Sequence, residues 1–410
     1  MENIKIKIGE KEMKEKNKEI FSVIGEYISY FYILSVFINS KLNMKIGYLL
    51  LVITLINVWI DKEKIKKVNK NIYVMFFIIF VMGIIWNYFG SASDGIDKFI
   101  RENGKFIYGI ALIISLNEKK KKEINFIIAF GINILSILFL YFNFPWLLNN
   151  DLTRARGIIL MGITYLLIYS LEKLFREKKI LWILSSIFPI LALIKTNSRM
   201  GAVVLIIILG IYLLQKLIEN KKNLKYIFII FIILLGSIKI IPSNYINRVK
   251  TSFHTKNNVS NEDRIVMWKA AVHIFNENRI FGIGNDSKDS IPLIQEYVDK
   301  NVADKRIRNE FLLYPRFPRV HNMYLDFLMQ NGIMIILYLF LLFYVIPKEL
   351  IFKIKNKTAE ILSGTYSILS FYIYGITWSV WSDYGIVHTL FQIILAVTIL
   401  YTINDKERLN

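Results

Sequence analysis

Cationic residues open four apolar segments of this sequence, and they are the side chains best suited to chemistry. The four stretches read FIRENGKF (99–106), LTRARG (152–157), TNSRMG (196–201) and RFPRVHN (316–322). A helix N-terminus already carries partial positive charge, so added cations there cost stability unless they bind an anion. Contact with lipid head groups is the alternative for any single side chain. The predicted anion-binding set is Arg101, Lys105, Arg154, Arg156, Arg199, Arg316 and Arg319.

One histidine adjoins these cations and can move a proton. Histidine titrates near neutral pH, which suits a general base, and His321 lies between Arg319 and an apolar segment. The alternative is a residue that only contacts head groups where that segment begins. The other histidines are expected in structural places: His254 in a flexible stretch, His273 packed in or exposed on a loop helix, and His388 hydrogen-bonded inside the last span.

The sequence offers little for a metal or redox centre. It contains no cysteine, and no two of its four histidines have the spacing of a zinc motif. Asp286 and Asp289 remain the alternative as a cation site. We predict neither a metal nor another cofactor.

Composition determines which elements must position these residues. The chain of 410 residues is 54% hydrophobic and 14% aromatic, with a mean hydropathy of +0.43, more apolar than a soluble core requires. We therefore predict an all-α polytopic membrane protein, because about 20 apolar residues cross the hydrocarbon as a helix. The twelve expected spans are 20–39, 45–60, 71–90, 99–116, 124–142, 158–172, 180–194, 200–218, 225–241, 322–346, 359–378 and 385–402.

The net charge of +20 would suit a nucleic-acid-binding protein, but the placement of the lysines argues against one. They cluster in every second connection, which the positive-inside rule makes cytoplasmic, and the charged fourth span is needed to keep later clusters on that side. The predicted segments are a cytoplasmic tail (1–19), nine spans (20–241), an extracytoplasmic loop (242–321), three spans (322–403) and a cytoplasmic tail (404–410).

This layout separates the two basic residue types. Only Arg176 and Arg408 fall on the lysine-rich side, and the other eleven arginines face outward. The outer surface is therefore expected to meet an anion. In the large loop we expect one helix over 262–278, with Ile265, Trp268, Val272 and Phe275 on its apolar face, and a second near 291–305.

The order of four motifs resembles the O-antigen ligase and polymerase superfamily. NSRMG opens a helix, DRIVMWKAA and RIFGIGNDS follow in the large outer loop, and VHNMYLDFLMQNGI begins the next helix. His321 and Asn322 are followed by Gly332, but the usual second glycine is replaced by Ile335, so helix packing past the histidine is expected to differ.

The resemblance implies a GT-C-like glycosyltransferase in the bacterial inner membrane, with its active site facing the periplasm or exterior. Such enzymes transfer a glycan from an undecaprenyl or other polyprenyl diphosphate carrier to an acceptor hydroxyl, without a metal and with inversion. A ligase uses lipid A–core as the acceptor in lipopolysaccharide biosynthesis, whereas a polymerase uses another carrier-linked repeat unit. His321 is then the catalytic base, the cations above bind the donor diphosphate, and Asn322 and Arg264 support them.

Two other classes of membrane protein are weighed against this one. A polysaccharide flippase or transporter would also have about twelve spans, but such proteins place charged sites near mid-membrane, whereas here the charges gather at one surface. A purely structural or regulatory component would not need the arginines kept on one side. Ligase and polymerase share all the motifs above, so the sequence leaves both open.

Overall fold

The computed structural model describes residues 2–90, 95–142, 152–179, 181–224, 228, 243–250, 259–285, 287–313, 320–354, 357–381 and 385–407. Every regular element in these residues is helical. The N-terminal half comprises α1 (Glu2–Ser35), α2 (Ser40–Ile60), η1 (Lys62–Lys67), α3 (Lys70–Phe89), α4 (Gly95–Asn103), α5 (Phe106–Ser115), α6 (Lys121–Phe142), α7 (Leu152–Glu177), α8 (Leu181–Leu184), α9 (Ile187–Lys195) and α10 (Arg199–Glu219). After η2 (Lys221–Asn223) come α12 (Ser243–Lys250), α13 (Val259–Glu277), α14 (Ser287–Asn301), α15 (Lys305–Leu313), α16 (Met323–Asn331), η4 (Gly332–Met334), α17 (Ile335–Phe340), the π-helical segments η5 (Leu341–Val345) and η6 (Lys348–Phe352), α18 (Ala359–Gly375) and α19 (Gly385–Glu407).

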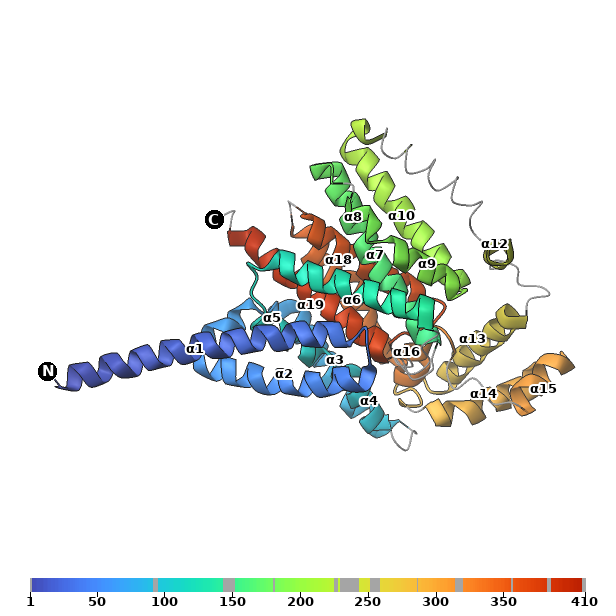
Figure 1. Cartoon of the computed structure of the whole chain (residues 1–410). Helices are drawn as coiled ribbons and strands as arrows, with labels where there is room; N and C mark the ends of the chain where they lie inside the picture. The colour runs from blue at the N-terminus through green and yellow to red at the C-terminus, as the bar shows by residue number, and fades with distance from the viewer. Residues whose placement is uncertain are drawn as a thin grey trace.

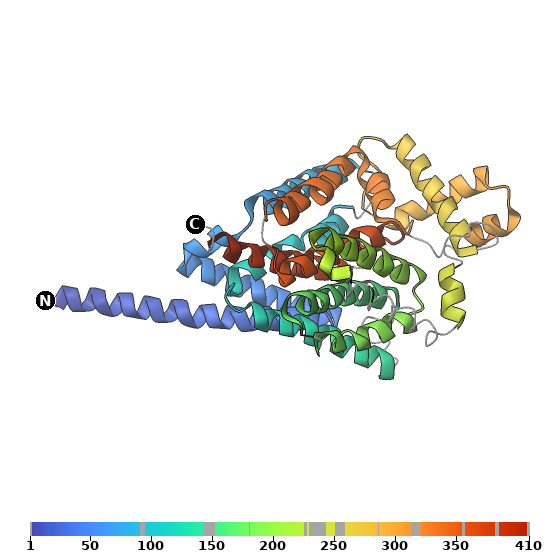
Figure 2. The same ribbon diagram turned by 90° about the horizontal axis from the view of Figure 1, so that it is seen from above.

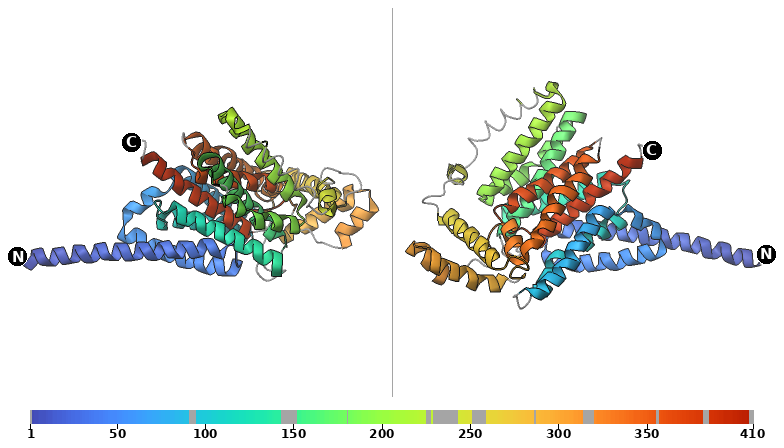
Figure 3. Two further views of the ribbon diagram at one scale, coloured as in Figure 1. Left: turned by 45° about the horizontal axis from the view of Figure 1, so that its top comes forward. Right: turned by 180° about the vertical axis from the view of Figure 1, so that it is seen from behind.

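The helices form one bundle with a separate helical layer at one end. Figure 1 shows α13, α14 and α15 gathered at the end opposite to both chain termini, and Figure 2 shows the same separation from above. The N-terminal part of α1 extends beyond the bundle in every view, including both views of Figure 3. The layer has its own apolar core, which includes Met267, Ile274, Ile294 and Phe311.

The chain is a multi-pass membrane protein. Seven helices among the described residues are long and apolar enough to cross a membrane. They are Ser40–Ile60, Lys70–Phe89, Lys121–Tyr141, Ala155–Glu177, Arg199–Glu219, Met323–Phe352 and Gly385–Ile403. All seven fall on spans expected from the sequence. Of the other expected spans, the ninth lies outside the described residues except for residue 228.

Two helices occupy the centre of the bundle. The apolar windows of α7 and α19 are 83% and 94% buried inside the protein, whereas those of α2 and α10 are 28% and 33% buried. The 17-residue helix α18 packs against both α7 and α19. Hydropathy alone ranks these helices together, because lipid and neighbouring helices are equally apolar surroundings.

One local expectation was wrong. The fourth span is not one helix: it breaks into α4 and α5 at Gly104 and Lys105, where a glycine and a charge interrupt the apolar pattern. In α13 the residues packed into the core differ from those of the expected apolar face. Met267, Ala270, Ala271 and Ile274 are buried, because the small alanines let α16 and α14 approach closely. The described part of the loop also contains two helices that were not predicted, α12 and α15.

Candidate active site

The backbone of His321 has a conformation that residues other than glycine rarely adopt. Its φ is 53°, in the left-handed region. The flanking residues hold it there: the Val320 carbonyl accepts a hydrogen bond from Trp268 Nε1 at 3.0 Å, and Asn322 caps α16 by accepting from Tyr324 N (2.9 Å) and Leu325 N (3.1 Å). Strain of this kind costs about 1–3 kcal/mol and persists where surrounding contacts enforce it. Asn322 therefore supports His321 by fixing the chain.

The glycine-rich turn of the outer loop fixes the other end of α16. Ile283 N donates to Met329 O at 3.0 Å, and Gly284 N donates to Gln330 O at 2.9 Å. Gly332 has φ 55°, and a Cβ there would lie 2.3 Å from the Ile280 carbonyl oxygen. Backbone meets backbone too closely for any other residue, which gives the glycine of the histidine motif a physical reason.

A second set of contacts joins this turn to the membrane bundle. Trp86 Nε1 of α3 donates to Ile280 O at 2.9 Å, and Asn285 N donates to Asn87 Oδ1 at 2.7 Å. Asn285 Nδ2 also donates to Glu102 of α4 at 2.6 Å. The turn that follows α13 is therefore attached to α3, α4 and α16 by directional bonds.

An aromatic ring and a guanidinium flank the histidine. The rings of His321 and Trp378 meet edge to face with centroids 4.9 Å apart, and the Arg264 guanidinium lies over the same Trp378 ring at 5.4 Å. Burial, and to a smaller extent the positive charge of Arg264, lower the pKa of His321 to about 4. His321 is therefore neutral at pH 7 and can accept a proton.

Tyr374, in the membrane bundle, lies near Trp378 and near two arginines. This tyrosine lies 6.2 Å from Trp378 between ring centroids and is within electrostatic range of both Arg156 and Arg264. Arg156 donates from Nε (3.1 Å) and Nη2 (3.0 Å) to the Thr196 carbonyl at the end of α9. Ser198 caps α10 by accepting from Gly201 N at 3.1 Å, so Arg199 stands at the first turn of that helix.

The arrangement thus brings together part of the predicted set. His321 and Arg264 both contact the Trp378 ring, and Arg156 lies within electrostatic range of the neighbouring Tyr374. Arg101 is exposed on α4 and pairs with Asp97. Lys105 lies instead against Gly385 at the start of α19. The side chain of Arg154 and residues Arg316 and Arg319 lie outside the described residues.

The outer layer adds a shallow surface groove beside this cluster. Its lining includes Ile265, Trp268, Val272 and Tyr297, so three of the four residues expected on the apolar face of α13 line it. Trp268 connects the groove to the candidate site through its bond to Val320. Lys269, His273 and Asn276 add polar groups to the same surface.

Residues 184–340 match a family model described as O-Antigen ligase. Over this segment the chain is similar to the O-antigen ligase superfamily. No curated protein matches it. The matched segment runs from the end of α8 to the end of α17 and contains Arg199, Arg264, His321 and Asn322.

Several residues around the superfamily motifs were missed by sequence reasoning. Trp378 and Tyr374 lie outside the matched segment, yet they connect His321 with Arg264 and Arg156. The available signal was the pair of tryptophans in ITWSVW (376–381), which by the expected topology precedes an outer connection. Aromatic residues at such a position are also common as membrane-interface anchors, so the signal was ambiguous.

The remaining sequence expectations concern histidines and metals. His388 hydrogen-bonds Gln392 at 3.1 Å inside the bundle, as predicted, and His273 lies at the surface of α13 beside Glu277. Within the described residues no three His, Cys, Asp or Glu side chains gather as a metal site. Residue 286 and the side chain of Asp289, the alternative cation site, lie outside the described residues, as does His254.

Proposed function

We propose that this protein belongs to the O-antigen ligase superfamily and transfers a glycan from a polyprenyl diphosphate carrier to a hydroxyl of lipid A–core. The reaction would take place on the outer face of the bacterial inner membrane, with inversion and without a metal. The observation that carries the proposal is that the strained His321 and the Arg264 guanidinium both contact the ring of Trp378.

The chemistry follows from these groups. His321 takes the acceptor proton while the oxygen attacks the anomeric carbon, and the bond from that carbon to the carrier diphosphate breaks. Charge that develops on the leaving diphosphate is stabilised by cations held in place beforehand, which can supply several kcal/mol in a site shielded from water. Arg264, Arg156 and Arg199 fill this role in the proposal, together with Arg154, Arg316, Arg319 and, less directly, Arg101 and Lys105.

The orientation in the proposal rests on charge and on shape. The outer layer α13–α15 lies at the end opposite to both termini (Figure 1), while lysines gather in connections assigned to the cytoplasm. In the proposal, the acceptor approaches along the groove beside Trp268, whose rim offers both apolar surface and hydrogen-bonding groups.

A deletion strain and a reconstituted assay test the proposal. Loss of all polymer from core, with carrier-linked chains accumulating, supports a ligase, whereas single repeats on core would identify a polymerase. Purified protein with a carrier-linked donor should turn over at an unchanged rate in EDTA. A rate that collapses in EDTA and returns with magnesium would contradict the metal-free mechanism and direct attention to Asp286 and Asp289.

A further inference from the structure

A cavity of about 250 Å³ lies within the membrane-spanning part, away from His321. α18 contacts both α10 and η6, and the cavity lies between these three elements and η5. Most of its lining is aliphatic or aromatic, and Gln215, Thr365, Tyr366 and Lys357 are the polar exceptions. Its apolar lining includes Ile211, Phe343 and Leu369.

The geometry of the helices explains why this cavity exists and on which side it opens. The span Met323–Phe352 changes to π-helical turns at Leu341–Val345 and Lys348–Phe352, on either side of Pro347. Such turns widen a helix locally and shift its side chains. Ile211 and Phe343 are 42% and 56% exposed, so the cavity opens sideways toward lipid.

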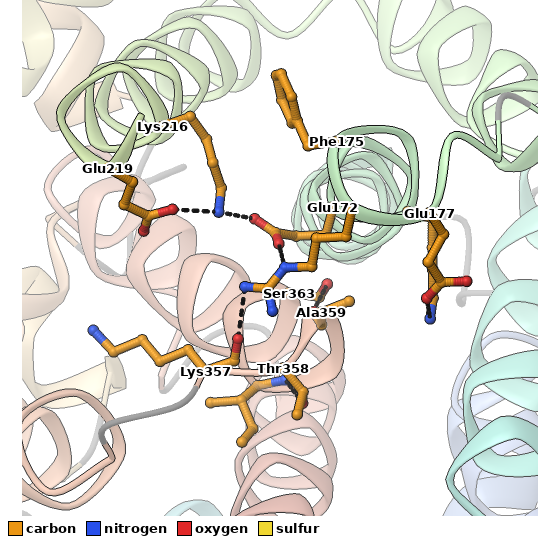
Figure 4. Close-up of polar contacts among 12 residues, drawn as sticks. Glu172, Phe175, Glu177, Lys216, Glu219, Lys357, Thr358, Ala359 and Ser363 are labelled. Atoms are coloured by element: carbon orange, nitrogen blue, oxygen red, sulfur yellow. Dashed lines mark hydrogen bonds and ion pairs between the residues drawn. The ribbon is translucent and has the colours of Figure 1, made fainter. Parts of the chain in front are cut away.

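The polar end of the cavity adjoins a cluster of paired charges. Glu172 is completely buried and accepts from Arg176 (2.5 Å), Lys216 (2.6 Å) and Tyr212 (2.9 Å). Lys216 also reaches Glu219 at 2.8 Å, so two carboxylates balance two cations in this cluster. Figure 4 shows these contacts joining the ends of α7 and α10.

Lys357 provides a positive charge that this cluster does not neutralise. Its carbonyl accepts a hydrogen bond from Arg176 at 2.8 Å, which fixes the backbone at the start of α18. Its side chain lines the cavity, and Figure 4 shows the ammonium pointing away from Glu172. Within the described residues no carboxylate pairs with Lys357.

The position of Lys357 indicates from which leaflet of the membrane a lipid could enter the cavity. Gln215 lies sixteen residues after Arg199 on α10, which corresponds to about 24 Å along the helix, most of the hydrocarbon thickness. The cavity is therefore at the opposite face from the candidate donor site. Lys348 and Lys353 lie on the same face, which the positive-inside rule assigns to the cytoplasm, where anionic lipids attract basic residues.

We propose that the cavity binds an anionic phospholipid of the cytoplasmic leaflet, with one acyl chain inside and its phosphate on Lys357. The proposal is independent of the glycosyl-transfer reaction. Lipid tails around the protein are as apolar as the cavity, so the cavity selects an acyl chain by its shape only. The preference for an anionic head group comes from the positive charge of Lys357. One basic residue near the surface corresponds to about a fivefold preference.

Native mass spectrometry of the purified full chain, titrated with phosphatidylglycerol or phosphatidylcholine, tests this proposal. Lys357→Gln should weaken phosphatidylglycerol retention about fivefold and leave phosphatidylcholine unchanged. Lys348→Gln is the matched control, because Lys348 is exposed on the same face and contacts Tyr344 without lining the cavity. It should leave both lipids unchanged.

A second variant tests the cavity itself. Leu369→Trp should fill it and reduce retention of both lipids, while gel filtration and helical content confirm the fold; Leu369→Phe serves if the larger ring prevents folding. Equal effects of the two lysine changes would overturn the proposal in favour of diffuse surface attraction. Retention unchanged by filling the cavity would also overturn it, as would stoichiometric displacement of phosphatidylglycerol by a polyprenyl phosphate.

Discussion

Replacement of His321 should separate a catalytic base from a residue that only shapes the site. A positioned general base contributes about 10²–10⁴-fold to turnover, so His321→Ala and His321→Gln should both lose activity by that factor. Glutamine retains hydrogen bonding but cannot accept a proton at neutral pH. Donor binding should persist in both variants, because the cations remain.

The pH dependence gives a sharper form of the same prediction. With its pKa near 4, about one His321 in a thousand is protonated at pH 7 in the free enzyme. A bound diphosphate would favour the charged imidazolium and raise that pKa. The acid limb of kcat/KM, which reports the free enzyme, should therefore lie near 4, and the limb of kcat, which reports the substrate complex, should lie at higher pH.

The assay is product formation from a carrier-linked donor by purified variants at matched protein levels, together with donor retention. Arg308→Ala is the control, because Arg308 also lies in the outer layer but is 44% exposed by side chain, pairs with Asp299 and does not line the groove. It should turn over normally. A His321→Gln enzyme with near-normal turnover, or a kcat limb at or below that of kcat/KM, would refute the base assignment.

Three further predictions concern topology and stability. A cysteine at Lys120 should be protected from an impermeant thiol reagent in intact cells, and one at the exposed Asn301 should react; labelling of the first would refute the orientation. Burial raises the pKa of Asp263 from 3.8 to about 6, so its ionisation opposes folding above that pH. Asp263→Asn should therefore stabilise the protein by about 1–3 kcal/mol at pH 7.5. This gain in stability should vanish below pH 3.8, where Asp263 is protonated in both the folded and the unfolded state. A gain in thermal stability that does not depend on pH would contradict this prediction. Gly332→Ala should destabilise by about 2–4 kcal/mol, because its Cβ meets the Ile280 carbonyl at a positive φ, and an unchanged melting temperature would show that α16 and the turn can separate.

The sequence predicts most of the membrane-spanning helices, but not the details of how they break and pack. Helices α2, α3, α6, α7, α10 and α19 follow from runs of apolar residues, because an isolated segment in lipid must satisfy its own backbone. The break between α4 and α5 is visible in the sequence as Gly104 and Lys105, yet hydropathy averaged over a window conceals it. The buried face of α13 was not apparent from the sequence, because alanines count weakly in a pattern but pack closely in a core.

The sequence by itself determined that the protein is a membrane protein and how lysine and arginine are distributed along it, and it singled out His321 and Gly332 as candidates. Each of these features depends on residue type or on local spacing, and both can be read from the sequence. Only the tertiary structure decided which cation joins His321. Arg264 of α13 contacts the same Trp378 ring as His321, and Arg156 of α7 lies within electrostatic range of Tyr374 of α18. That choice depends on how α7, α13 and α18 pack, and close packing is a property of three-dimensional shape that no local pattern encodes.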